Sequence, residues 1–427
     1  MIKRLIVALS LFFSFVSVAQ ENTASPYSFY GLGEQKFKGT AENRAMGGIS
    51  TIPDSIHVNI QNPAFYPHLK LTTLSTGATY ANYRFKTNDD KEKARRTTLD
   101  YLAVGIPMGK FGAGFGLMPY TAVGYKINNI IAPTENNGFP DQIYRYSGTG
   151  GLNKAFLGLG YEFAKGFTIG AEFGYYFGKI ETMTTLTTSI NENNQPTEYG
   201  TRELIDSKAT GPGMNVGLAY VSKIGKKLSF AASAMYTAQS RISLNNDGQL
   251  ATIKILSNNQ TIVVDEQELG LDDTQVNLPS KISFGASLGQ ARKWFVGAEV
   301  TLLQNNDGGN RGSIVDNVGY KDGVRYAIGG YFIPKYMSFS DYWKKVTYRA
   351  GLKYEETGLV INNKSINDAT MTLGVGLPLG GTFSNINLGF EYGKKGTRDA
   401  GLVEENYFNF TLGLSFNDRW FQKRKYD

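Results

Sequence analysis

The stretch FTIGAEFGYYF, residues 167–177, alternates large apolar side chains with small or polar ones at every second position. In a β-strand, successive side chains point to opposite faces, so this stretch has one apolar face and one glycine-rich, polar face. A helix would space its apolar residues three and four apart, and this stretch does not. The alternation therefore predicts a long strand whose two faces meet different surroundings.

The same period of two recurs along the chain from residue 69 to residue 417. Clear examples lie at residues 155–163, 294–302 and 408–416. Counting such segments predicts fourteen strands, near 69–87, 96–107, 111–126, 154–164, 166–181, 212–222, 227–240, 280–290, 292–303, 322–333, 344–356, 367–378, 383–393 and 403–417. In the first strand the alternation changes phase between Tyr80 and Tyr83.

The predicted connections differ in length on the two sides of the sheet. Short turns such as PMGK, residues 107–110, alternate with long polar connections at 127–153, 182–211, 241–279 and 304–321. Short turns at one end and long loops at the other are typical of bacterial outer-membrane barrels. We therefore predict an all-β fold, a transmembrane antiparallel β-barrel of about 14 strands. An exported soluble β-sandwich or propeller is the alternative, and it would bury the apolar face and space its turns evenly.

The composition excludes several classes of function. The 427 residues include no cysteine, which excludes disulfide scaffolds and thiolate metal sites. Only two histidines occur, His57 and His68, which argues against a His-rich metal site or a Ser-His-Asp hydrolase. The formal net charge of +7 gives no reason to expect nucleic-acid binding. We predict a protein that is not an enzyme and uses no metal and no cofactor.

The chain begins with a predicted secretory signal peptide, residues 1–19. Lys3 and Arg4 form a cationic start, an apolar stretch follows, and small residues end it at Ala19. An N-terminal membrane anchor is the alternative, for which the segment is short. Export together with a barrel pattern predicts the bacterial outer membrane as the location.

Residues 20–68 do not alternate and are expected to form a hatch or plug inside the barrel formed by residues 69–417. They contain SPYSFYGLG at 25–33, RAMGG at 44–48, Asp54, and the triplet Asn62-Pro63-Ala64. A glycine- and proline-punctuated segment ahead of a barrel is best placed in the lumen. Residues 418–427 form a basic tail on the periplasmic side, which is either solvated or available to a partner or to anionic headgroups.

With these motifs the chain resembles the FadL-like outer-membrane long-chain fatty-acid transporter family. That family has an N-terminal hatch with a Gly-Leu-Gly stretch, a glycine-rich element, an Asp and an Asn-Pro-Ala triplet before a fourteen-stranded barrel. The resemblance implies passive uptake of hydrophobic or amphipathic, fatty-acid-like molecules past a luminal hatch to a lateral exit. It also implies an alternative, because related barrels assist type IX secretion. In that case the barrel transports nothing and plugs or docks with a larger assembly such as a type IX translocon.

Three groups of residues are candidate site residues. Gly47, Gly48, Asn62, Pro63 and Ala64 belong to the hatch, where the triplet is either a gating element or a plain turn at the junction with the barrel. Pro63 favours an extended residue before it and can open a short helix after it. Inward-facing glycines of the strands make room for the hatch or for a ligand.

Pro119 interrupts the third predicted strand, where its missing N–H implies a bulge or a kink. The family resemblance implies a lateral gate there, with Pro119 and Tyr120 as its candidates. The alternative is that Pro119 lies at the membrane rim.

Glu172, Glu299, Glu391 and Arg349 fall on the polar face of their strands, between apolar neighbours. We expect a luminal network of ion pairs and hydrogen bonds that holds the hatch. Paired carboxylates would also suit glycoside hydrolysis, but nothing in the sequence pairs these acids with a substrate motif. The expected partners are outer-membrane lipids, a fatty-acid-like ligand, or a secretion-complex partner.

Overall fold

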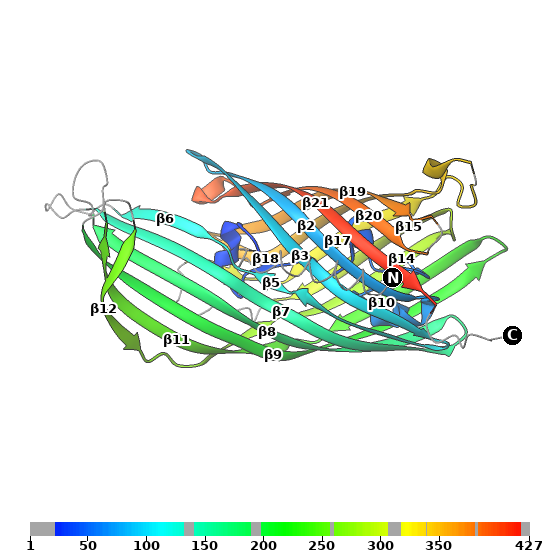
Figure 1. Ribbon diagram of the computed structural model, residues 1–427, viewed down its shortest axis with the longest axis horizontal. Coiled ribbons are helices and arrows are strands. Elements are labelled where there is room, and N and C mark those ends of the chain that lie inside the picture. Colours follow the sequence, from blue (N-terminus) through cyan, green and yellow to red (C-terminus); the bar gives the residue numbers. More distant parts are fainter. Residues whose placement is uncertain are drawn as a thin grey trace.

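The computed structural model describes residues 22–131, 141–188, 198–256, 260–305, 317–338, 340–380 and 383–419. These residues form a closed, elongated antiparallel β-barrel (Figure 1). Fourteen strands of the described residues build the wall, so the predicted fold class is confirmed. The predicted signal peptide and the cationic part of the tail, Lys423 to Lys425, lie outside the described residues. No helix in the described ranges is long and apolar enough to cross a membrane.

The wall strands follow one another in chain order, and β21 pairs with β2 to close the barrel. Each pairing is antiparallel, as expected for strands joined by hairpins. The wall consists of β2 (Thr72–Lys86), β3 (Lys91–Met108), β4 (Phe111–Pro119), β7 (Gln142–Ala164), β8 (Phe167–Thr188), β9 (Tyr199–Ile224), β10 (Leu228–Thr237), β14 (Ser280–Gln290), β15 (Trp294–Gln304), β17 (Gly323–Phe332), β18 (Thr347–Ile361), β19 (Lys364–Pro378), β20 (Asn385–Lys395) and β21 (Glu404–Asp418).

The long connections expected to be loops are in large part strands, which corrects the prediction. β7, β8 and β9 run well beyond the predicted ends, and further strands lie at the same end of the barrel. These further strands are β6 (Lys126–Ile131), β11 (Ser240–Ile255), β12 (Thr261–Leu269), β13 (Thr274–Leu278) and β16 (Val318–Tyr320). On β12 the side chains of both faces are exposed, so the apolar–polar alternation is lost although the chain remains a strand. We call this end the outer end, and the end with short turns the periplasmic end.

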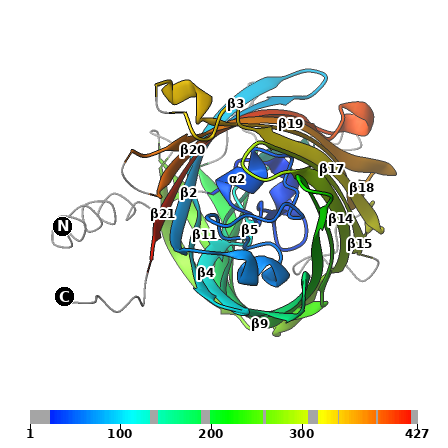
Figure 2. The same cartoon turned by 90° about the vertical axis from the view of Figure 1, so that its right-hand side faces the viewer.

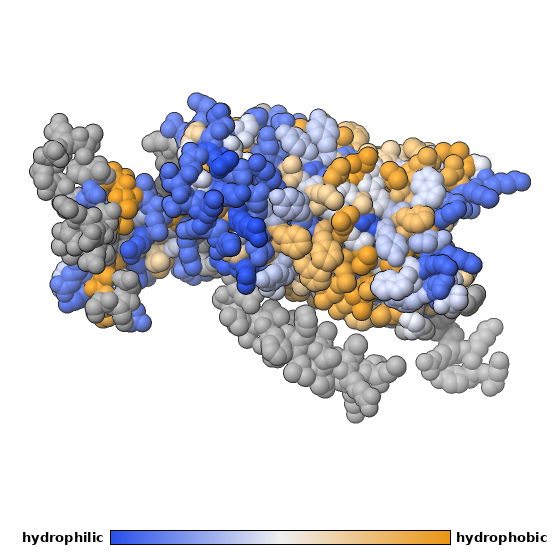
Figure 3. Space-filling view, turned by 90° about the horizontal axis from the view of Figure 1, so that it is seen from above, coloured by the Kyte–Doolittle hydropathy of each residue, from blue (hydrophilic) through white to orange (hydrophobic). Residues whose placement is uncertain are grey.

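The outward and inward faces of the wall differ as the alternation predicts. On β8, Phe167, Ile169 and Phe173 are exposed, whereas Gly170 and Glu172 between them are buried. Such exposed side chains form an apolar belt over the periplasmic half of the molecule, and hydrophilic surface lies beyond it (Figure 3). An apolar band between two polar ends is the surface of a protein that spans a bilayer.

The segment before β2 lies inside the barrel (Figure 2). It contains η1 (Pro26–Phe29), β1 (Glu34–Gln35), α2 (Ala41–Arg44) and η2 (Pro63–His68), where η denotes a 3₁₀ helix. The two-residue strand β5 (Thr121–Ala122) pairs with β1. Buried apolar residues of the segment, such as Val58, Ile60 and Tyr66, pack against the inner wall, so the core of the protein lies in its lumen. The helices η3 (Tyr342–Lys344) and η4 (Asp399–Gly401) lie in connections between wall strands.

Candidate functional site

One side of the N-terminal segment packs against a glycine-lined wall made by β4, β7, β8 and β9. Asn62 caps η2, because its Oδ1 accepts a hydrogen bond from the Ala64 N–H at 3.0 Å. A Cβ on Gly170 would lie 2.3 Å from the Pro63 carbonyl carbon, and one on Gly217 would lie 2.1 Å from Asn62 Oδ1. Only glycine fits at these contacts. Asn62, Pro63 and Ala64 are therefore held between the wall and the rest of the segment.

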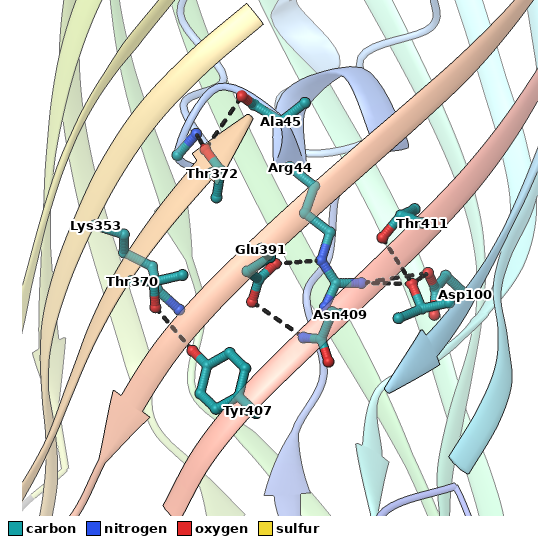
Figure 4. Close-up of polar contacts among 12 residues, drawn as sticks. Arg44, Ala45, Asp100, Lys353, Thr370, Thr372, Glu391, Tyr407, Asn409 and Thr411 are labelled. Carbon is teal, nitrogen blue, oxygen red and sulfur yellow. Dashed lines mark hydrogen bonds and ion pairs between the residues drawn. The ribbon is translucent and has the colours of Figure 1, made fainter. Parts of the chain in front are cut away.

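Gly47 and Gly48 lie on the opposite side of the lumen and have positive φ angles of 70° and 83°. This left-handed conformation favours glycine. The Gly47 N–H donates to Thr372 Oγ1 at 2.9 Å, and the same hydroxyl donates to the Ala45 carbonyl at 3.1 Å (Figure 4). The turn after α2 is thereby bound to β19.

Arg44, the last residue of α2, binds two carboxylates of the wall (Figure 4). Its Nε lies 2.6 Å from Glu391 Oε2, and its Nη1 lies 3.3 Å from Asp100 Oδ2. The Asn409 amide donates to the other Glu391 oxygen at 3.3 Å. Asp100 forms a β-bulge between β2 and β3. Gly77 pairs with Tyr101 and Ala78 pairs with Leu99, so Asp100 has no paired residue on β2. The bulge directs the Asp100 carboxylate to Arg44.

Glu299 anchors the next part of the segment. Its Oε2 accepts from the Ser50 N–H at 2.8 Å and from the Ser50 hydroxyl at 2.7 Å. Its Oε1 lies 3.0 Å from Arg325 Nη2 on β17. Glu172 binds two wall residues, with Lys154 Nζ at 2.5 Å and Asn215 Nδ2 at 2.8 Å. Each acid thus has its own cation, and the three do not meet as a catalytic pair.

Arg349 reaches the segment through an amide. It donates to Asn387 Oδ1 at 3.0 Å, and Asn387 donates to Glu42 Oε1 at 2.6 Å. Beside them, His57 Nδ1 lies 2.7 Å from Asp54 Oδ2. Burial opposes the charged form of Asp54, but His57 lowers the pKa of that carboxyl to about 2. Burial by itself would lower the pKa of His57, but the negative charges of Asp54 and Glu42 raise that pKa above its usual value.

The wall is interrupted on one side of β4. Pairing between β3 and β4 ends at Leu102 and Leu117. Pairing with β7 continues past Pro119, because the Tyr120 N–H donates to the Leu152 carbonyl at 2.7 Å and Val123 pairs with Gly150. Tyr120 turns inward, is 2 % exposed, and its ring lies 4.5 Å from that of Tyr176. Behind the break lies a cavity of only about 40 Å³, lined in part by Phe37, Arg44 and Pro119. The break therefore leads to a region that the N-terminal segment fills.

A luminal cavity of about 210 Å³ is lined in part by charged side chains, and a second one of about 200 Å³ adjoins it. The charged lining of the first includes Lys38, Lys281 and Arg325 as well as Glu355, Asp368 and Glu405. Lys38 Nζ also lies 3.7 Å from the centre of the Tyr120 ring. A hydrophobic molecule would have to cross these charges, which are costly to desolvate. No group of three possible metal ligands occurs in the described ranges.

Sequence reasoning missed several members of this network, namely Arg44, Asp100, Lys154, Arg325 and Asn387. Side chains alternate between the inner and the outer face along a strand, and this alternation could have identified Lys154 and Arg325 as inward-facing. Lys154 is two residues before the buried Phe156, and Arg325 is two before the inward Ala327. Asp100 could not be assigned in this way, because the bulge in β3 reverses which residues of the strand face inward on its two sides.

A second candidate region lies at the outer end, far from the membrane belt. On β12, Ile262 and Val264 are 52 % and 57 % exposed, and β12 pairs only with β11 among the described strands. Figure 3 shows apolar surface at this end, separated from the belt by hydrophilic surface. An exposed apolar edge strand is a ready template for pairing with another chain. Natural proteins usually protect such an edge.

Comparisons with known proteins agree with the barrel. The family model BamG matches residues 1–427. No curated protein matches the sequence. Among solved structures, the Pseudomonas putida toluene transporter TodX is 17% identical with a TM-score of 0.58, covering 91% of this chain and 99% of TodX. The CymD monoaromatic hydrocarbon channel is 12% identical with a TM-score of 0.58, covering 90% and 98%.

A Pseudomonas aeruginosa FadL homologue is 12% identical with a TM-score of 0.56, and the match covers 91% of this chain and 99% of that homologue. The predicted resemblance to the FadL-like family is thereby confirmed as a shared fold. The chain thus shares its architecture with a toluene transporter and a monoaromatic hydrocarbon channel. At such identities the likeness concerns the fold.

Proposed function

The chain belongs to the BamG family, and on this premise we propose that it is an outer-membrane barrel that docks with a larger assembly and transports nothing. The sequence suggested this function as the alternative to uptake of hydrophobic molecules. We now place it first because of one observation. The lumen is occupied by residues 22–71, and two adjoining luminal cavities of about 210 and 200 Å³ are lined in part by charged side chains.

The anchoring of the N-terminal segment supports a permanent plug. Backbone atoms of Pro63 contact the wall at glycine positions, and Arg44 is bound by two carboxylates. A ligand path would require these contacts to open together. Removing one partner of a buried ion pair typically costs about 3–5 kcal/mol, so a lumen held in this way favours a structural role.

The outer end supplies a surface for the partner. The apolar side chains of β12 stand on an edge strand above the belt, in contact with water rather than lipid. Addition of a partner strand to such an edge satisfies backbone N–H and C=O groups and covers the apolar side chains. The proposed partner is therefore a protein at the outer surface of the membrane.

Native purification tests this function. The full chain, tagged and produced in its own outer membrane, is extracted in mild detergent and analysed for bound proteins and bound lipids. We expect a protein partner in fixed ratio, lost in the double variant Ile262→Asp/Val264→Asp. Gln267→Asp, which adds a charge at a polar position of the same strand, should keep the partner. A chain that purifies alone in both forms would refute docking.

Uptake of hydrophobic or amphipathic molecules remains the second candidate, because the fold is shared with the toluene transporter TodX and the pairing between β3 and β4 ends just before Pro119. In this reading residues 20–68 are the hatch, and Pro119 and Tyr120 form the lateral gate. Cells that produce the chain should then take up a hydrophobic probe faster. Restoring strand pairing by deleting Tyr120 to Gly124 should abolish the gain. Uptake that is equal with and without the barrel would exclude this function.

A further inference from the structure

We infer that the membrane-facing surface of β15, β17, β18 and β19 binds one anionic glycerophospholipid of the periplasmic leaflet. An acyl chain lies in an apolar groove of the wall, and the phosphate lies at a cationic rim below it. The site is on the outer face of the barrel wall, and the inner face of the same strands contacts the plug. It is independent of the proposed docking function.

The groove is a hollow in the lipid-facing surface, with a volume of about 1020 Å³. Cross-strand pairs define its shape. Gly330 pairs with Val296 on one side and with Ala350 on the other, and Ala350 pairs with Leu373. Gly330 and Ala350 form a low floor between bulky neighbours. A Cβ on Gly330 would lie 2.1 Å from the Phe295 carbonyl oxygen, so no side chain can fill this position.

Large side chains enclose the floor at both ends. Trp294, Phe332 and Tyr348 form the next row of paired residues towards the periplasm. Ile328 and Leu352, which pair with each other, form the row towards the outer end. Trp and Tyr are enriched at the level of lipid headgroups, which places the first row at the membrane interface. The groove therefore begins just inside the hydrocarbon.

A second apolar hollow of about 660 Å³ continues the groove towards the outer end. The two share Ile328, Leu352 and Met371 in their linings. From Trp294 to Val300 the chain advances six residues, or about 20 Å along the strand. With a tilt of about 40° this spans about 15 Å across the membrane, which is the thickness of one leaflet. The length matches one acyl chain of the periplasmic leaflet.

The periplasmic end of the groove carries a cluster of positive charge. The turn after β14 contributes Arg292 and Lys293, and the connection after β17 contributes Lys335, Lys344 and Lys345. Asp341, which pairs with Lys344, is the single acid in residues 291–293 and 333–346. The two connections are joined, because the Ile333 N–H donates to the Lys293 carbonyl at 2.6 Å. Arg292 lies 5.0 Å from the centre of the Tyr336 ring.

Aromatic side chains accompany these cations at the same rim. Trp343 is 68% exposed, and the Tyr348 hydroxyl donates to the Trp343 carbonyl at 3.2 Å. Cations beside exposed aromatic residues at the bilayer surface match a phosphate above an acyl chain. The phosphate of an anionic lipid would supply negative charge to a rim where Asp341 is the one acid beside five cations. Charge complementarity therefore favours the lipid over a protein neighbour.

The test uses the full chain purified from outer membranes and analysed by native mass spectrometry. We expect one phospholipid to remain bound after detergent exchange, and dioleoylphosphatidylglycerol to rebind to delipidated protein in a ratio of one. Ala350→Leu fills the floor and should lower retention about tenfold, as loss of a fitted apolar site predicts. Ala171→Leu, the same change on the lipid face of β8, should not lower it.

A second pair of variants tests the rim. Arg292→Gln/Lys293→Gln should weaken phosphatidylglycerol binding about tenfold, because each surface cation contributes to attraction of an anionic lipid. Lys226→Gln/Lys227→Gln, in the turn between β9 and β10, should leave binding unchanged. All variants must show the gel mobility of a folded barrel before boiling. Absence of lipid from the wild type, or equal retention by Ala350→Leu, overturns the site. Crosslinks from Ala350 to a protein without bound lipid would show a protein interface instead.

Discussion

The two sides of the lumen hold the N-terminal segment by different means. On β4, β7, β8 and β9, glycines let backbone meet backbone around η2. On β15 and on β17 to β21, charged and polar side chains reach the segment between Thr40 and Asp54. The glycine side depends mainly on shape. On the polar side, backbone contacts at Gly329 and Gly351 are joined by ion pairs and by hydrogen bonds to charged groups. Protonation should therefore affect the polar side more than the glycine side.

The difference shows why one chain needs both surfaces. Close contact between the backbones of η2 and the wall fixes the position of η2 without relying on flexible side chains. Such contact leaves no room for an added atom. Ion pairs and amides span longer gaps and adapt to the curved wall, provided that every buried charge is matched.

Arg44→Met should be the most destabilising change on the polar side. It leaves the buried Glu391 and the partly buried Asp100 without their cation, at a cost of about 3 kcal/mol. The measurement is the temperature at which the folded gel band is lost. Lys208→Met removes an exposed pair with Asp247 and should cost less than about 1 kcal/mol. Equal shifts for both variants would contradict the role of the polar side.

Gly170→Ala should be the corresponding change on the glycine side. Its Cβ would lie 2.4 Å from the Ala64 nitrogen, and overpacking of this kind typically costs about 1–3 kcal/mol. Gly389→Ala is the matched control on the polar side, because the nearest atom to its Cβ is Thr411 Cβ at 3.5 Å. We expect the control to unfold at the wild-type temperature. If both variants behave alike, the wall does not discriminate by volume.

Asn62→Ala should cost about 1 kcal/mol by removing the cap of η2. Barrel assembly should be unaffected, which the gel shift before boiling checks. The variant also separates the two candidate functions. If Asn62 gates a ligand path, passage of a hydrophobic probe should change, whereas a permanent plug leaves passage unchanged.

The smallest expected effect is a pH dependence of opposite sign on the two sides. The raised pKa of His57 stabilises the polar side below about pH 6.5, and this stabilisation is lost as the pH rises through the raised value. Burial lowers the pKa of His68, with Glu162 opposing it, so the end of η2 is stabilised above about pH 6.5 and less so as the pH falls.

Hydrogen exchange of the two peptides, corrected for intrinsic rates, measures this contrast. The peptide around His57 should exchange faster at pH 9, and the peptide around His68 should exchange faster at pH 5. His57→Gln should remove the first effect and leave the second. A common pH profile for both peptides would refute the distinction between the two sides.

Much of the wall was predictable because each strand meets lipid on one face. Residues 280–290 coincide with β14, and the alternation of residues 167–177 matches the burial of β8 residue by residue. The outer strands were not predictable, since β12 has water on both faces and no alternation. Of the site, the inward positions of Glu299 and Glu391 followed from strand parity. Their partners did not, because Arg44 and Glu391 are 347 residues apart.

The sequence by itself determined a fourteen-stranded barrel with an apolar outer face, because the solvent on each side of a strand selects every second residue locally. Tertiary structure alone decided which polar groups meet in the lumen, where the pairing between β3 and β4 ends, and that Gly330 and Ala350 form the floor of an external groove. Those outcomes depend on strand register, on the bulge at Asp100 and on the curvature of the closed wall. None of these is encoded in a local pattern, because each arises only when distant strands pair.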